Sequence, residues 1–186
     1  MTETQWRVAT TPTEEARVGQ AVLSLVQEDA ERLAWLSAGA AASVAEVPDD
    51  AAAASRFQTM LELAYLVASA DGFAQAERVS LAALLEQITG SAVDHATLEL
   101  HFRDLDDAVA LLGRRERFAR AAADLDGPKQ GEEAITLVSM VALADGHLSP
   151  PEYEALVELG RYTDVSAARV RALVEATVQR LEAKLR

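Results

Sequence analysis

The sequence predicts a compact all-α domain that contains two related helical repeats. Half of the 186 residues are hydrophobic, and most of these are Ala, Leu and Val, which favour helices and supply a sizeable core. The sequence contains no alternating run of β-branched and aromatic residues between turn residues, which is the pattern that indicates a strand. The third observation is a repeat, since the segment 60–85 has a second copy at 134–159.

Each copy of the repeat is an apolar helix that runs into Ala-Asp-Gly, turns, and begins a new helix near a glutamate. Asp71 corresponds to Asp145 at an offset of 74 residues, whereas Glu77 corresponds to Glu152 at an offset of 75 residues. The second turn is therefore one residue longer. Two copies predict one pseudo-twofold domain, because a solenoid needs at least about three repeats.

Residues 1–48 are predicted to form a helical extension ahead of the repeats. The chain is polar as far as Thr11, and this first stretch is expected to fray. A long amphipathic helix is predicted over 12–36, because Thr11 and Glu14 suit a capping box and apolar residues follow at helical spacing. Trp6 is expected to pack or to anchor this extension.

The domain proper is predicted over 49–186. Repeat one covers about 51–112, repeat two covers about 130–186, and a linker helix over about 114–126 joins them. The first helix of repeat one becomes apolar on nearly every side, which predicts a central position. The whole chain is expected to form about seven or eight helices. Those of the domain are predicted over 51–70, 76–88, 92–112, 114–126, 130–144, 150–162 and 166–186.

The linker helix is locally basic, with Arg114, Arg115, Arg117 and Arg120 in a short run. These arginines could form a patch for an acidic partner or for lipid headgroups. We expect instead a solvated face that also balances acidic neighbours.

The composition limits the classes of function. The formal net charge is −13, so the chain repels nucleic-acid phosphates and anionic lipid surfaces on average, and no nucleic-acid partner is expected. Cysteine is absent, which excludes disulfides and thiolate metal sites. The first residues do not resemble a signal peptide, and no apolar run approaches the roughly 20 residues of a membrane helix. A cytoplasmic location is expected.

The second turn, over 145–152, has the pattern of a helix stop followed by a helix start. Gly146 is predicted to end one helix in a left-handed conformation. Ser149 and Glu152 then suit a capping box, with Pro150 at the first helical position. In this interpretation Glu152 has a structural role without any metal.

The aspartates of the two turns allow a second interpretation. Asp71 and Asp145 each follow a helix C-terminus, where the helix dipole disfavours an anion by about 0.3–1 kcal/mol. A carboxylate in that position, occurring twice, calls for a compensating cation. Ca²⁺ or Mg²⁺ is favoured over Zn²⁺, because hard cations take carboxylate and carbonyl oxygens and the chain has only three histidines.

A helix that ends in Ala-Asp-Gly, followed about seven residues on by a glutamate that opens a new helix, and duplicated, resembles the TerB-like family, named for tellurite-resistance proteins. The resemblance covers roughly 50–186. It implies a compact all-α fold with internal symmetry and an acidic cluster proposed to bind divalent metal. It also implies a role in stress-response systems linked to metal and to membrane-associated complexes. Carried over by position, the candidate metal ligands are Asp71, Glu77, Asp145 and Glu152.

Two functional hypotheses follow. In the first, a TerB-like stress-response domain binds or senses a divalent cation and acts through protein partners, which could belong to a membrane-associated complex. In the second, a metal-free helical scaffold docks its partners, and the Asp-Gly turns are only helix stop and start signals. An enzyme is not expected, because nothing marks one carboxyl as raised and another as lowered in pKa, as a hydrolase with paired carboxylates would require.

Overall fold

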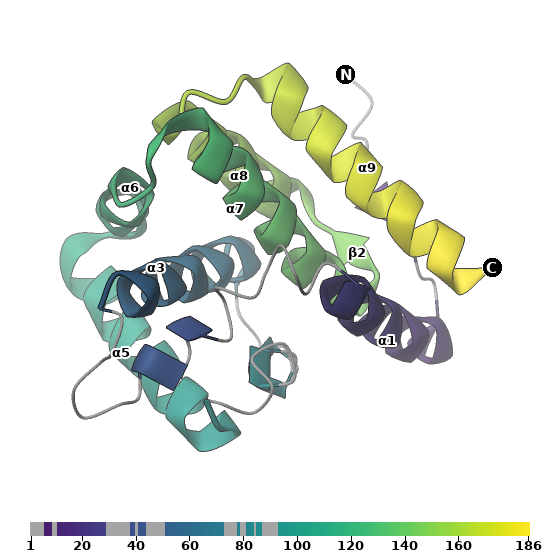
Figure 1. Ribbon diagram of the computed structural model, residues 1–186, viewed down its shortest axis with the longest axis horizontal. Coiled ribbons are helices and arrows are strands. Elements are labelled where there is room, and N and C mark those ends of the chain that lie inside the picture. The colour runs from purple at the N-terminus through teal and green to yellow at the C-terminus, as the bar shows by residue number, and fades with distance from the viewer. Residues whose placement is uncertain are drawn as a thin grey trace.

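Two apolar helices, α3 (Ala51–Ala68) and α7 (Gly127–Ala142), pack against each other at the centre of the computed structural model (Figure 1). From Thr59 to Val67, every side chain of α3 except Glu62 is buried. The prediction that this helix is central is therefore confirmed. The residues that the structure describes are 6–8, 11–28, 38–39, 41–43, 51–72, 78, 81–83, 85–86 and 93–186.

The chain continues from α7 into three further helical elements. A 3₁₀ turn, η1 (Leu143–Asp145), leads towards α8 (Pro150–Tyr162), and α9 (Ala167–Leu185) follows. Both α8 and α9 pack against α7, and α8 also contacts α3. The predicted helices over 150–162 and 166–186 are confirmed, with a serine hydroxyl accepting the N-capping hydrogen bond in each.

The other side of α3 is covered by the linker helix. After α5 (His95–Leu112), Gly113 with a φ of 83° breaks the chain, and α6 (Arg114–Ala123) begins. The helix α6 packs against α3, α5 and α8. It is polar by composition, and it buries Phe118 towards the core. The predicted helix over 92–112 begins later, at His95, because the preceding aspartate caps it.

At the opposite end of the molecule, α1 (Pro12–Glu28) packs against α9 and η1 (Figure 1). Its buried residues Val18, Val22 and Leu25 belong to the same core as α3 and α7. The predicted helix over 12–36 is confirmed as far as Glu28, and the rest of it lies outside the described residues.

A two-stranded antiparallel sheet corrects the expectation that the chain has no strand and that its first residues fray. The strand β1 (Trp6–Arg7) pairs with β2 (His147–Leu148), so that Trp6 lies opposite Leu148 and Arg7 opposite His147. The N–H of Val8 extends the pairing by donating to the carbonyl oxygen of Gly146 at 2.7 Å. Two-residue strands are shorter than the alternating run by which a strand is recognised in sequence.

Candidate functional site

The candidate site consists of the two Asp-Gly turns that follow the central helices. Gly72 has a φ of 101° and Gly146 a φ of 88°, and glycine adopts this left-handed region at little cost. The preceding side chains, Asp71 and Asp145, are both exposed. The structure therefore places one exposed carboxylate beyond the C-terminal end of each central helix.

Three of the four predicted residues lie in one region of the molecule. Burial, together with the negative charges of Asp71 and Asp145, raises the pKa of the Glu152 carboxyl to about 8, against hydrogen bonds from Ser149 that lower it. Glu152 thus experiences the charge of both turns. The fourth residue, Glu77, lies outside the described residues.

This proximity does not amount to a ligand set. Among the residues that the structure describes, no group of three or more His, Asp or Glu side chains could hold a metal ion. Two of the carboxylates, Asp145 and Glu152, already accept hydrogen bonds from backbone donors of their own turn.

Glu152 is held by the helix that it opens. Its Oε2 accepts from the N–H of Ser149 at 2.7 Å, and the Ser149 hydroxyl oxygen accepts from the N–H of Glu152 at 3.3 Å. Glu152 is only 7% exposed, and Pro150 occupies the first helical position. The capping box predicted for this turn is therefore confirmed.

Asp145 also has a local partner. Its Oδ1 accepts from the backbone N–H of His147 at 2.9 Å, which closes a small turn of the type that aspartate side chains commonly form. The turn therefore supplies a donor to this carboxylate from its own backbone.

The first turn has a cation beside it, and that cation is Arg114. Nη1 of Arg114 donates to the carbonyl oxygen of Ser69 at 3.0 Å and to its hydroxyl at 3.2 Å. Burial lowers the pKa of Arg114, and the negative charges of Glu158 and Asp71 oppose this effect. Carbonyls at a helix end have no partner within the helix. Arg114 thus brings a positive charge to the end of α3, where the sequence called for a cation.

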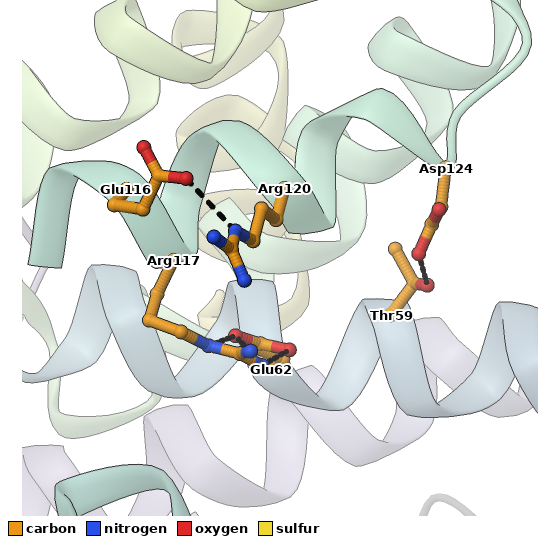
Figure 2. Close-up of polar contacts among 6 residues, drawn as sticks. All are labelled: Thr59, Glu62, Glu116, Arg117, Arg120 and Asp124. Carbon is orange, nitrogen blue, oxygen red and sulfur yellow. Dashed lines mark hydrogen bonds and ion pairs between the residues drawn. The ribbon is translucent and has the colours of Figure 1, made fainter. Parts of the chain in front are cut away.

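Arg117 continues the attachment of α6 to α3 (Figure 2). Its Nε donates to Glu62 Oε1 at 2.8 Å, and its Nη2 donates to Oε2 at 2.6 Å. Further along, the hydroxyl of Thr59 donates to Asp124 Oδ2 at 3.3 Å (Figure 2). The two helices run antiparallel, with these polar contacts along their interface. The predicted solvated face is therefore wrong for Arg114 and Arg117, although both arginines do balance acidic neighbours.

A second polar cluster involves the acidic stretch of α5. Asp106 accepts hydrogen bonds from the hydroxyl of Tyr65 and from Nη1 of Arg78. Burial, and then the hydrogen bond to Asp106, raise the pKa of Tyr65 above its usual value. The ring of Phe102 stacks on that of Tyr65 with centroids 5.4 Å apart. Asp106 thus ties α5 to α3.

No protein-family model, curated protein or solved structure matches the chain. In the part of the chain that the structure describes, no helix combines the length and apolar character that crossing a membrane requires. The relation to TerB-like proteins stays a proposal that depends on the repeat itself.

Proposed function

We propose that this chain is a TerB-like helical domain that acts as a protein-interaction scaffold in a stress-response system and works without a bound metal. The observation that carries this proposal is that intramolecular partners already occupy the acidic turns. Glu152 is used by its capping box, and Asp145 accepts from its own turn. Arg114 supplies the positive charge at the end of α3. In this view the Asp-Gly turns are helix stop and start signals.

The protonation of Glu152 supports the same conclusion. With a pKa of about 8, the carboxyl is mostly protonated at neutral pH. Ca²⁺ and Mg²⁺ prefer ionised carboxylates. Binding to Glu152 would therefore require loss of a proton and exposure of a buried group.

The pseudo-twofold arrangement is part of the proposal. It is supported by the equivalent ends of α3 and α7, each of which leads to an Asp-Gly pair with a left-handed glycine. Such symmetry would place related helix faces on two sides of one core.

Exposed apolar side chains support a docking role. Leu111 is 83% exposed and Leu112 is 39% exposed at the end of α5, next to the start of α6. Tyr162 is 38% exposed and packs its ring against that of Phe118 in α6. Apolar surface beside the linker helix is suited to a protein partner.

The second candidate function is binding or sensing of a divalent cation, Ca²⁺ or Mg²⁺. The observation that favours it is the shared influence of Asp71 and Asp145 on Glu152, which gathers negative charge from both turns. Ligation by Glu77 and Glu152 would complete the predicted set, and Glu152 would have to leave its capping box.

Thermal unfolding of chelator-treated protein separates the two functions. Ca²⁺, Mg²⁺, Mn²⁺ and Zn²⁺ are titrated at fixed ionic strength. The metal-free scaffold predicts a midpoint that does not change with cation concentration. A cation site predicts a free energy of unfolding that rises with the logarithm of cation concentration, by about 2.7 kcal/mol at a hundredfold excess over Kd. A rise that is lost in Asp71→Asn and Asp145→Asn, and kept in the exposed control Asp107→Asn, would reject the metal-free proposal.

The docking role is tested by crosslinking in the native cell. The crosslink to a partner that binds the proposed surface should be lost in the variant Leu111→Asp. It should be retained in Leu100→Asp, which changes a leucine that is 60% exposed elsewhere on the same helix. Equal crosslinking by both variants would place docking away from the linker helix.

A further inference from the structure

We infer that the edge of β2 is a binding site for an extended peptide, and that the chain's own residues 6–8 occupy this site as a displaceable self-ligand. The inference rests on the proposed role as a protein-interaction domain, and it names one class of partner. The occupied edge lies in the second Asp-Gly turn, directly before the capping box of α8.

The backbone contacts are those of strand addition. β1 runs antiparallel to β2 in a fixed register, and the N–H of Val8 donates to the carbonyl oxygen of Gly146. Within the described ranges, β1 is the strand that β2 pairs with. In strand addition, main-chain hydrogen bonds provide affinity, and alternate side chains that enter pockets provide specificity.

The side chains of the self-ligand define what the site accepts. The ring of Trp6 packs against that of Tyr153 in α8, with centroids 6.4 Å apart and planes at 44°. The guanidinium of Arg171 in α9 lies 5.9 Å from the centroid of the Trp6 ring. Val8 also packs against the core, whereas Arg7 is exposed. The matching partner is an extended peptide with an aromatic residue followed two positions later by an aliphatic one.

The rest of the structure holds β2 more firmly than it holds residues 6–8. Leu148 of β2 is 1% exposed, and the adjoining Ser149 belongs to the capping box. The pairing itself is short, because β1 and β2 have two residues each, and two-stranded ribbons are marginally stable in water. Segments with few buried contacts open locally at a lower cost than global unfolding. Residues 6–8 are therefore expected to leave β2 while the domain stays folded.

Hydrogen exchange of the unaltered full chain tests displacement. The Val8 amide should exchange through local opening, at a rate insensitive to low denaturant, and with protection at least about tenfold below that of amides in the middle of α7. Exchange of Val8 only together with α7 would mean that the segment is a fixed part of the core, and the inference would be overturned.

A labelled peptide with the sequence of residues 4–10, TQWRVAT, tests the site itself. The peptide is titrated onto the full-length variant Trp6→Ala and onto the unaltered chain. We expect saturable binding to the variant and at least about tenfold weaker binding to the unaltered chain, because its own segment competes. A peptide with alanine in place of the tryptophan, and the double variant Trp6→Ala/Tyr153→Ala, should each lose about tenfold in affinity.

Lack of peptide binding to the Trp6→Ala variant, or equal binding of the two peptides, would refute the peptide site. The scaffold role would survive either result, since the cation titration and the Leu111 comparison test it separately. Peptide binding together with a cation-dependent midpoint would instead keep the site and reject the metal-free function.

Discussion

Arg114 donates a hydrogen bond from its guanidinium to the backbone carbonyl oxygen of Ser69, 3.0 Å away, where α3 ends. This bond joins the linker helix to the first Asp-Gly turn. It also brings a positive charge to a helix end at which Asp71 is electrostatically unfavourable. The two turns are therefore stabilised differently, the first by a side chain from another helix and the second by its own backbone and a capping box.

Replacing this arginine should destabilise the fold. Arg114→Met keeps most of the side-chain length and removes the charge, and we expect it to lower the free energy of unfolding by about 1.5–3 kcal/mol, the range for hydrogen bonds from charged groups. Urea unfolding measures the loss. The exposed control Arg103→Met on α5 should change stability by no more than about 0.5 kcal/mol. Adding Asp71→Asn to Arg114→Met should recover part of the loss, and equal losses in Arg114→Met and Arg103→Met would contradict the role of Arg114.

Glu152 should make stability depend on pH. Its pKa is about 8 in the folded chain and near 4.5 when unfolded, so between these values the folded state holds a proton that the unfolded state has lost. Its contribution is fully present below about pH 4.5 and is lost as pH rises towards 8, at up to about 1.4 kcal/mol per pH unit. Glu152→Gln keeps the capping-box acceptor and removes the titration. Urea unfolding at several pH values should therefore show a flatter profile for this variant.

The neighbouring aspartates provide a second check on Glu152. Asp71→Asn and Asp145→Asn each remove a negative charge that raises the pKa of Glu152. In each variant the upper end of the pH window in which stability falls should move to lower pH, while the lower end, which the unfolded chain sets, should not change. An unchanged window in both would mean that the turns do not influence Glu152 in solution.

The ion pair between Glu62 and Arg117 should be worth more than an ordinary surface pair. Its side chains are 13% and 23% exposed and are joined by two hydrogen bonds. A double-mutant cycle with Glu62→Gln and Arg117→Met should give a coupling energy of about 1–3 kcal/mol. The matched control is the pair Glu116–Arg120 within α6, whose side chains are more than half exposed and which should give about 0.3–0.5 kcal/mol (Figure 2). Equal coupling in both cycles would mean that the α3–α6 contact adds nothing beyond a solvent-exposed pair.

Local chemistry made the helices and their ends predictable. Ser149 caps α8 and Gly146 ends its turn in the left-handed region, as predicted, and Ser166 caps α9. Each of these features depends on residues within about four positions of one another, so the local sequence is enough to predict it. The apolar character of α3 likewise predicts its burial, because no face of it is suited to water.

The contacts between distant segments could not be predicted in the same way. The pairing of β1 with β2 joins the start of the chain to the second turn, and spacing does not encode it. The orientation of α6 is set by burial of Phe118, which turns Arg117 towards Glu62. The sequence therefore indicated that a cation was needed near Asp71, but it could not show that Arg114 lies there.

His101 gives a pH dependence of the opposite sign to that of Glu152. Its Nε2 is buried and has no hydrogen-bond partner among the residues that the structure describes, and burial lowers the pKa of His101 against the opposing charges of Asp104 and Glu62. The unfolded chain therefore takes up a proton first as pH falls below about 6.5, so the contribution of His101 is present above that pH and is lost towards its lower folded pKa.

His101→Leu should remove the loss of stability that the protonation of His101 causes at low pH. Urea unfolding at pH 5 and pH 8 should show a smaller fall in stability at pH 5 than in the unaltered chain. At pH 8 the variant should be unchanged or more stable by about 1 kcal/mol, because a buried polar group without a partner is removed. His95→Leu, at the first residue of the same helix, is the control and should keep the acid loss. A fall that is the same in both variants would assign the acid sensitivity to groups other than His101.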